Sequence, residues 1–476
     1  MKSTDIPVKT RIKRICAVAC FAALVFLCIF GTYKVLKWKD TMGEYLSSVD
    51  MLKATDKELI DVVFMGSSHA YNGFNPAYFW EDKGWSCFDM AISGQDATST
   101  YYYLKYLLRR QSPKVVCVDL YGFTFDKHGV QGNEYRNYLS MPAVDLQVKM
   151  VREYVDEEDR QDYIVRFPIV HTRYKELGKY DFYNYKLNDY IRGEKISWTV
   201  GEACAPESSD GSLSPAELSE SKVKWLDDMY ELSQKEGFSL VLVALPYNIP
   251  AESQEKIDTV SKYCEEKGIA FYDFNRLRHE IGFDYTHDFV DSGHLNTYGA
   301  KKVEMFLKEE FECYNLPDHR GDERYYQWDE DLEYFGREEY KNSMRVTDDL
   351  CALCSMICAG EDYVSVISLE GDYLDRNNVY YEPLWILGMS YEEYEKGGKW
   401  IFEDGTLTKV FENEINADPY IKELGDMNTL KIQYEGDYLF RENIMINDES
   451  VYSYGSFMTI AIYDKKLGEL VSVKGF

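Results

Sequence analysis

The sequence predicts an α/β protein: a three-layer domain built on a parallel sheet, preceded by one transmembrane helix and followed by a smaller, mostly β domain. Three observations predict this architecture. An uncharged stretch lies near the N-terminus, nearly continuous apolar strands alternate with amphipathic helices in the middle of the chain, and short β-like runs separated by turns fill the C-terminal part. Of the 476 residues, 45% are hydrophobic and 28% are charged, which is a globular composition.

The uncharged stretch lies between Arg14 and Lys34. Its length matches the ~20 residues that cross a bilayer as a helix. The basic residues before it should stay in the cytoplasm by the positive-inside rule. We therefore expect a cytoplasmic tail over 1–14, a transmembrane helix over 15–36 and an extracytoplasmic remainder at the cell membrane. A cleaved signal peptide is the alternative, although the stretch is long for one and has no good small-residue cleavage site.

The charge and the cysteines exclude other classes. A formal net charge of -29 repels phosphate backbones, so we expect no nucleic-acid partner. The eleven cysteines show no regular spacing, and Cys351, Cys354 and Cys358 form the only cluster. Because no fourth ligand lies close by in sequence, we interpret this cluster as one face of a core helix and keep a metal or redox site as the alternative. No metal and no cofactor are expected.

The parallel-sheet domain is expected over residues 58–316. Strands are predicted at 60–65, 85–92, 115–118, 239–245 and 269–274, and helices at 98–110, 216–236, 253–267 and 299–311. Active sites in such sheets lie at the carboxyl ends of the strands. Residues 124–214, rich in tyrosine and charge, interrupt the pattern and are expected to form an insertion over the site.

The C-terminal part changes character. Residues 317–344 are polar and aromatic, as in a linker. Residues 345–476 are expected to form a β-rich accessory domain. Its predicted strands lie at 364–369, 400–403, 430–434 and 458–463.

Two segments of the parallel-sheet domain carry chemistry. Ser68 follows Gly66 at the end of the first strand, where a tight turn can present a nucleophile and aim its N–H at a developing oxyanion. Asp291 and His294 lie three residues apart between the last strand and the last helix. That spacing lets the carboxylate hold one imidazole nitrogen while the other faces a hydroxyl. We predict Ser68 as nucleophile, His294 as base and Asp291 as its orienting group; polar helix caps are the alternative.

Together these residues resemble the SGNH (GDSL-like) hydrolase family. Ser68 matches the serine of block I, Gly94 the glycine of block II, and Asp291-x-x-His294 block V. The resemblance implies an oxyanion hole that includes the amides of Ser68 and Gly94. One departure is that the place of the block III Asn reads Asp119-Leu-Tyr-Gly-Phe, without Asn. Asn72 and Asn248 are the candidate substitutes.

The segment Gly66-Ser-Ser-His69, together with Phe167-Pro-Ile-Val-His-Thr-Arg-Tyr174, resembles the membrane-anchored DltD/AlgJ-like branch of this group. Members of that branch work on cell-surface polymers, often in O-acylation beside a membrane acyltransferase. The resemblance implies a cell-surface glycan or acylated polymer as substrate and a membrane-bound O-acyltransferase as a candidate partner. It makes His69, His171 and Arg173 candidates for substrate binding. The alternatives are a local structural role for His69 and surface helix positions for the other two.

The C-terminal residues 345–476 resemble the interleukin-like EMT inducer (PANDER-like) domain. The similarity lies in Leu430-Lys-Ile432, Ile444-Met-Ile-Asn447 and Thr459-Ile-Ala-Ile-Tyr-Asp464. By analogy alone, it implies an accessory glycan-binding role.

We therefore expect a membrane-anchored serine esterase or O-acyltransferase that acts on acyl esters of cell-surface glycans through an acyl-Ser68 intermediate. One rival is a non-catalytic, membrane-tethered protein of glycan binding or polysaccharide assembly that keeps the SGNH fold. The missing block III Asn favours this rival, and the intact Ser68, Asp291 and His294 oppose it. A second rival is a glycan-binding surface protein whose C-terminal domain is the functional part.

Overall fold

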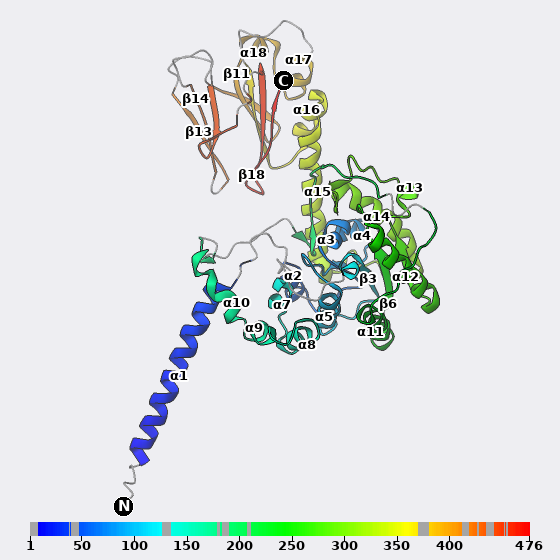
Figure 1. Ribbon diagram of the computed structural model, residues 1–476. Helices are drawn as coiled ribbons and strands as arrows, with labels where there is room; N and C mark the ends of the chain where they lie inside the picture. Colours follow the sequence, from blue (N-terminus) through cyan, green and yellow to red (C-terminus); the bar gives the residue numbers. More distant parts are fainter. Residues whose placement is uncertain are drawn as a thin grey trace, which may run out of the picture. The chain divides into compact units, whose positions relative to one another are not determined.

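The computed structural model describes residues 8–37, 39, 47–125, 135–178, 181–182, 190–206, 211–369, 380–411, 418–425, 428–434, 442–451, 453 and 456–476. The chain divides into two compact units, Met1–Phe335 and Gly336–Phe476 (Figure 1).

The first unit contains α1 (Val8–Leu36), α2 (Ser47–Ala54), β1 (Val62–Met65), α3 (Ser68–Gly73), α4 (Pro76–Lys83), β2 (Cys87–Asp89), α5 (Ala97–Leu107), β3 (Val115–Asp119), α6 (Tyr121–Thr124), α7 (Tyr135–Ser140), α8 (Val144–Tyr154), α9 (Arg160–Val165), α10 (Phe167–Val170), η1 (His171–Lys175), β4 (Tyr190–Ile191), β5 (Glu194–Lys195), α11 (Glu220–Glu236), β6 (Ser239–Ala244), α12 (Ala251–Lys267), β7 (Ala270–Asp273), α13 (Arg278–Ile281), β8 (Phe289–Asp291), β9 (His294–Leu295), α14 (Thr297–Glu310), η3 (Phe311–Tyr314) and η4 (Glu323–Tyr325). Helix α15 (Tyr326–Val346) crosses the boundary, and the second unit continues with α16 (Leu350–Ala359), β10 (Tyr363–Leu369), α17 (Tyr381–Ile386), α18 (Tyr391–Lys396), β11 (Gly398–Glu403), β12 (Thr406–Phe411), β13 (Tyr420–Leu424), β14 (Asn428–Tyr434), β15 (Glu442–Ile446), β16 (Glu449–Ser450), β17 (Met458–Asp464) and β18 (Glu469–Gly475).

The apolar N-terminal stretch forms helix α1. Within the described residues, Ile12–Leu36 is the one helix long and apolar enough to cross a membrane, and none of its most apolar window is buried in protein. The expected apolar helix is therefore present. A signal sequence near the N-terminus has the same length and composition.

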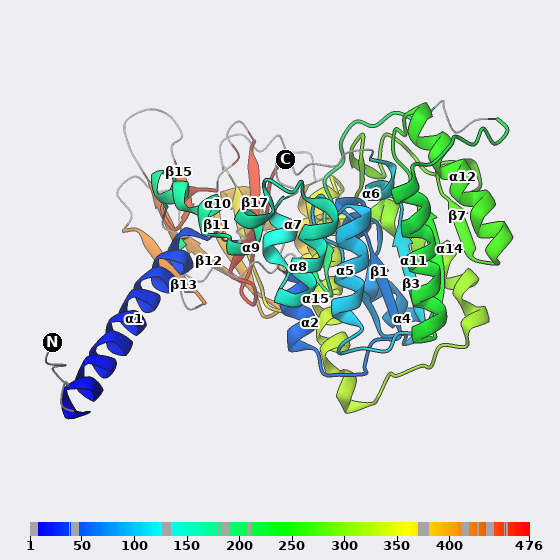
Figure 2. The ribbon, with the colours of Figure 1, turned by 60° about the horizontal axis from the view of Figure 1, so that its bottom comes forward.

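The first unit is built on a five-stranded sheet of order β2-β1-β3-β6-β7, and every neighbouring pair is parallel. Alternate side chains point to opposite faces. On one face Val63, Met65 and their neighbours pack against α2, α5, α8, α11 and α12; several of these helices lie in front of the sheet in Figure 2. On the other face Val62, Phe64 and their neighbours pack against α3, α4 and α14. Burial on both faces explains why these strands are continuously apolar, and it confirms the predicted three-layer α/β architecture.

The segment expected to form an insertion over the site divides into two parts. Helix α8 buries Leu146, Met150 and Val151 in the core beside α5, so this part completes a face of the sheet. The later part runs beside the loop that carries Asp291 and His294, where the Gly201 N–H donates to Phe289 O at 2.8 Å. Among the described residues of this segment, it is the later part whose contact with the site loop the structure records.

Much of 317–344, expected to form a linker, is helix α15. Its N-terminal half buries Trp328, whose indole N–H donates to Cys87 O at 3.0 Å, and Phe335, which packs on Tyr78. This half of the helix therefore belongs to the core of the first unit, which explains why the segment is rich in aromatic residues.

The second unit is mostly β, as predicted. It contains antiparallel sheets of order β12-β11-β10-β17-β18 and β13-β14-β15-β16. One core lies between the two sheets, and another lies between the larger sheet and its helices. In α16, Leu353, Cys354 and Ile357 are buried whereas Cys351 and Cys358 are exposed. The core-helix interpretation is right, but the three cysteines do not share the buried face.

Candidate active site

The turn after β1 presents Ser68. Gly66 has φ of +151°, and a Cβ there would lie 3.0 Å from Ala70 Cβ and 3.1 Å from Asp119 Cβ, so the turn needs glycine. Ser67 is wholly buried and caps α3, because its hydroxyl accepts the His69 N–H at 3.4 Å. Ser68 is the first residue of α3 and stays partly exposed. The local fold therefore offers the hydroxyl of Ser68, and not that of Ser67, to a substrate.

A continuous chain of hydrogen bonds joins Ser68, His294 and Asp291. Ser68 Oγ lies 2.8 Å from His294 Nε2, and His294 Nδ1 lies 2.9 Å from Asp291 Oδ1 and 3.1 Å from Oδ2. Asp291 Oδ1 also accepts the N–H groups of Gly293 and His294 at 2.8 and 3.0 Å. Partial burial opposes ionisation of Asp291, but these bonds and His294 outweigh it and lower the pKa of its carboxyl. With Nδ1 donating to a carboxylate, His294 Nε2 is free to accept the proton of Ser68.

Asp288, the other carboxylate of this loop, is engaged elsewhere. It is wholly buried, and its Oδ2 accepts the Asp284 N–H at 2.7 Å and the Lys302 ammonium at 2.5 Å. Its Oδ1 lies 3.1 Å from His287 Nδ1. Asp288 therefore ties the loop to α14, and Asp291 is the carboxylate that faces His294.

Two backbone amides are available as oxyanion donors. Gly94 has φ of +64°, and its loop is held against the nucleophile turn because the Ile92 N–H donates to Gly66 O at 3.2 Å. Within the described parts of the chain, neither the Ser68 N–H nor the Gly94 N–H donates a hydrogen bond. Both groups can therefore serve a ligand.

The two asparagine candidates lie differently. The Asn72 side chain is nearly buried and donates to Ser68 O at 2.7 Å, so one of its N–H groups supports the nucleophile residue itself. Asn248 has an exposed side chain, and its backbone N–H donates to Ser292 O at 3.0 Å beside His294. Asn72 therefore acts locally in this structure, and Asn248 lies at the edge of the Asp291–His294 loop.

Asp119, at the position of the block III Asn, supports the turn that carries the nucleophile. Asp119 is buried and accepts the N–H groups of Leu245 and Tyr121 at 3.1 and 3.2 Å. Burial raises the pKa of Asp119 to about 7, although these N–H groups oppose the shift. Its position beneath Gly66 makes it a support of the nucleophile turn.

His69 lies in an aromatic enclosure beside His294. Its ring stacks on Tyr121 at 3.5 Å, meets Tyr247 edge-on at 5.0 Å and lies 5.0 Å from the ring of His294. Burial, and then the charge of His294, hold the pKa of His69 well below its usual range, so it is neutral at physiological pH. Its buried Nε2 has no hydrogen-bond partner among the described residues. Neither Tyr121 nor Tyr247 was predicted as a site residue, although Tyr121 lies two residues after β3, where such sheets place active-site residues.

The structure places Arg173 and His171 at the end of α1. Arg173 donates to Leu36 O and Lys37 O at 2.9 Å each and pairs with Asp181 at 2.9 Å. His171 Nδ1 is engaged with Pro168 O of its own turn. These contacts fix the segment to the apolar helix. Substrate binding by His171 and Arg173 stays a prediction.

Comparisons with known proteins add little to this geometry. No family model and no curated protein matches the chain. Among solved structures, a "putative acylhydrolase" from Bacteroides fragilis is 12% identical, with a TM-score of 0.30, and the match covers 58% of this chain and 98% of that one. A GDSL-like lipase from Bacteroides thetaiotaomicron is 13% identical, with a TM-score of 0.28, over 57% of this chain and 98% of that one. At these TM-scores and identities, neither likeness carries a functional conclusion for this chain.

Proposed function

We propose that the first unit is a serine esterase or O-acyltransferase of the SGNH type. The main support is a pair of hydrogen bonds at the carboxyl end of the parallel sheet. Ser68 Oγ lies 2.8 Å from His294 Nε2, and His294 Nδ1 lies 2.9 Å from Asp291 Oδ1. A serine hydroxyl is a weak nucleophile until a neighbouring base takes its proton. The arrangement supplies that base and the carboxylate that orients it.

The reaction has two halves. Ser68 Oγ attacks the ester carbonyl carbon while its proton passes to His294 Nε2, and the N–H groups of Ser68 and Gly94 stabilise the oxyanion. The ester C–O bond breaks, the alcohol leaves with the proton from His294, and acyl-Ser68 remains. Water or a sugar hydroxyl then attacks the acyl carbon and gives its proton to His294. The bond from the acyl carbon to Ser68 Oγ breaks, His294 returns the proton to Oγ, and the acid or the new ester leaves. Water makes the reaction a hydrolysis, and a sugar hydroxyl makes it an acyl transfer.

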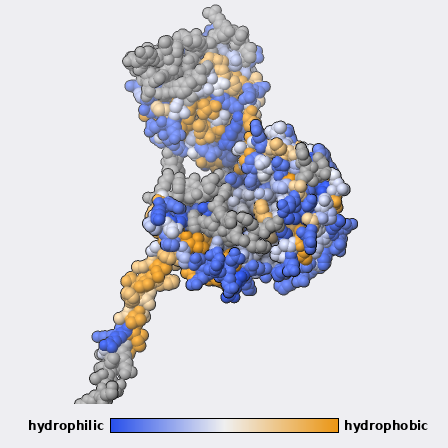
Figure 3. Space-filling view, in the orientation of Figure 1, coloured by the Kyte–Doolittle hydropathy of each residue, from blue (hydrophilic) through white to orange (hydrophobic). Residues whose placement is uncertain are grey.

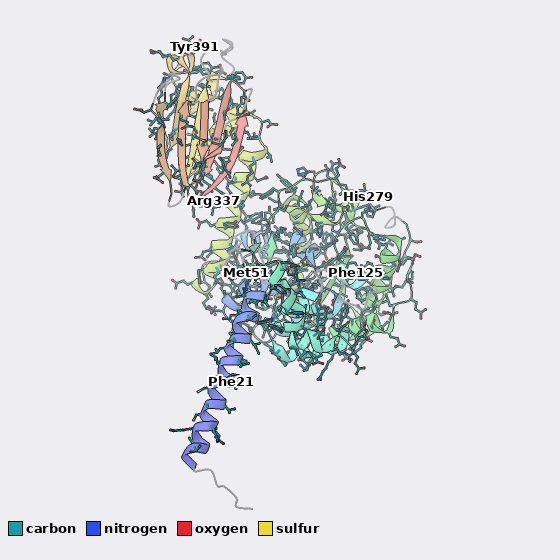
Figure 4. The ribbon with its side chains drawn as sticks, turned by 60° about the vertical axis from the view of Figure 1, so that its left-hand side comes forward. Phe21, Met51, Phe125, His279, Arg337 and Tyr391 are labelled. Atoms are coloured by element: carbon teal, nitrogen blue, oxygen red, sulfur yellow. The ribbon has the colours of Figure 1, made fainter. Side chains whose placement is uncertain are left out.

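The proposed substrate is an acyl ester of a cell-surface glycan, handled outside the membrane that α1 crosses. Two features support this. The side chains of His294 and Asp291 are 30% and 56% exposed, so the catalytic pair is open to a bulky substrate. The ring of Phe125 (Figure 4) is 46% exposed and contacts Tyr121 edge-on, with the ring centroids 4.9 Å apart. It extends the aromatic surface around His69 towards solvent. We propose His69 as a substrate contact.

We further propose an accessory glycan-binding role for the second unit. Its helices α17 and α18 expose aromatic rings, with Trp385 67% and Tyr391 42% accessible. A membrane-bound O-acyltransferase remains the proposed partner in the transfer reaction.

A non-catalytic assembly protein is the second candidate function. One observation favours it: the place of the block III Asn is taken by Asp119 and Tyr121, which support the turn and stack on His69 instead of offering an amide. Loss of that donor weakens oxyanion stabilisation, since a single donor of this kind is worth ~10²–10³ in turnover.

The test is labelling of the full chain, in detergent, by a fluorophosphonate probe. We expect one covalent adduct at Ser68, its loss in Ser68→Ala and its retention in the matched variant Ser67→Ala. Labelling that survives in Ser68→Ala would refute the assignment of the nucleophile. A folded wild-type chain that neither labels nor hydrolyses p-nitrophenyl acetate would favour the non-catalytic candidate.

A further inference from the structure

We propose that the segment Arg160–Lys175, here called the collar, lies on the outer lipid interface of the membrane that α1 crosses and inserts apolar side chains among the headgroups. The collar comprises α9, α10 and η1. The inference rests on the membrane-anchor part of the proposed function and is independent of the catalytic part.

The end of α1 sets the level of the collar. At about 1.5 Å per residue, the 25 residues Ile12–Leu36 span about 37 Å, more than the ~30 Å hydrocarbon core, so the last turns of α1 reach the outer interface. Arg173 caps this end through the carbonyls of Leu36 and Lys37. Helices α10 and η1 both contact α1 (Figure 1), and Leu36 is only 6% exposed. The collar is therefore fixed at the depth where the helix leaves the hydrocarbon.

The collar buries few of its side chains in protein. Neither α9 nor η1 has a buried residue, and only Val170 is buried in α10. Ile164, Val165 and Tyr174 are 37%, 55% and 63% exposed, and the neighbouring Phe182 is 64% exposed. Short helices are not stable on propensity alone and need an apolar surface to pack against. A lipid interface offers that surface, and Tyr is enriched at this level of membranes.

The apolar surface of α1 reaches the folded unit that carries the collar, as Figure 3 shows. The collar carries four basic residues and one acidic residue, and the four acidic residues Asp156–Asp159 precede it. This near balance of charge means that apolar burial, and not attraction to anionic lipid, should hold the collar in place.

The experiment is photo-crosslinking of the full chain in phosphatidylcholine nanodiscs. A diazirine amino acid is placed at Val165, at Phe21 of α1 (Figure 4) as the lipid-facing reference, or at Met305 of α14 as the control; these side chains are 55%, 67% and 58% exposed. Mass spectrometry counts lipid adducts at each position. We expect adducts at Val165 within about threefold of Phe21 and at least about tenfold above Met305, since only the first two positions meet lipid.

Other outcomes overturn the inference. Adducts at Phe21 but no more at Val165 than at Met305 would leave the anchor standing and remove the collar from the membrane. Protein adducts at Val165 in place of lipid would assign the surface to a second copy or a partner. If no lipid adduct forms at Phe21, both the membrane anchor and the collar inference are refuted. The fluorophosphonate experiment tests the nucleophile separately and does not affect this conclusion. A yield at Val165 that rises more than about tenfold in phosphatidylglycerol discs would replace apolar insertion with charge attraction.

Discussion

Asp288 and Asp291 stand three residues apart on one loop, each beside a histidine, yet their surroundings differ. Asp288 is wholly buried, accepts an ammonium and a backbone N–H, and its neighbour His287 is half exposed. Asp291 is 56% exposed at its side chain, and its histidine faces Ser68. The same residue types thus have two roles: Asp288 stabilises the loop, and Asp291 forms the proposed catalytic pair with His294.

The difference shows that burial and partners, and not residue type or spacing, separate the two roles. The buried Asp288 also contacts an imidazole, that of His287, but its other oxygen is held by Lys302 and the Asp284 N–H, which tie the loop to α14. A carboxylate at the rim can orient an imidazole that stays open to substrate. Four measurements would sharpen or break this comparison.

The largest effect is expected at His294. His294→Ala should reduce p-nitrophenyl acetate turnover nearly as much as Ser68→Ala, by on the order of 10⁶-fold, because nucleophile and base act as a unit. The measurement is kcat of the folded variants, with circular dichroism to establish folding. Substantial turnover in His294→Ala would show that another group, such as His69, serves as the base.

Asp291→Asn should come next, with a loss of about 10⁴-fold in kcat and an unchanged fold, because the amide favours the wrong imidazole tautomer. Asp288→Asn is the matched control, an identical chemical change on the same loop, and should change kcat of the folded protein by less than about tenfold. If Asp288→Asn proves the crippled variant and Asp291→Asn stays near wild type, the assignment of the two carboxylates is reversed.

Asp288→Asn should instead act on stability. Removing the charge that faces Lys302 in a buried site should lower the free energy of unfolding by about 2–3 kcal/mol, since Lys302 is itself partly exposed and can recover some hydration. Urea denaturation followed by circular dichroism measures this value, with Lys302→Met as the companion variant. If the wild type and Asp288→Asn have the same free energy of unfolding, Asp288 does not stabilise the loop through Lys302.

The smallest effect concerns the acid range. The pKa of Asp291 is lowered in the folded protein, so its contribution to stability is present above the unfolded pKa of about 3.9 and is lost as pH falls through the folded pKa. Exposure limits this contribution to less than about 1 kcal/mol. Between pH 7 and pH 3, the free energy of unfolding should therefore decrease slightly less in Asp291→Asn than in the wild type. Denaturant unfolding curves measured across this pH range give the two values. A steeper acid loss in that variant would contradict the pairing with His294.

Much of the α/β unit could be predicted because its signals are local. Strands buried on both faces are continuously apolar, and β1, β3 and β6 lie where such runs occur. Boundaries were less predictable: the expected strand 85–92 pairs only over Cys87–Asp89, and the helix expected from 216 begins at Glu220. Strand ends depend on pairing partners and helix starts on capping, and neither is fully visible in a local pattern.

The candidate triad residues could be named from their order and spacing, whereas several neighbours could not. Tyr121 and Tyr247 enclose His69 through contacts between residues far apart in the chain. Arg173, read as a substrate contact from its flanking residues, caps α1 because folding brings the collar to that helix. Helix α15 falls where a polar linker was expected, since its aromatic residues meet partners in the first unit.

The sequence by itself determined the architecture and the identity of the serine, the histidine and the nearby carboxylates, because apolar periodicity and a strand-end glycine act over a few residues. Only the tertiary structure decided that Asp288 is held by Lys302, that Ser67 is buried while Ser68 is open, and where the collar attaches. These outcomes depend on burial and on hydrogen bonds such as Ser68 Oγ–His294 Nε2, which joins residues 226 positions apart in the chain. Contacts at such separations exist only once the chain has folded, so no local pattern encodes them.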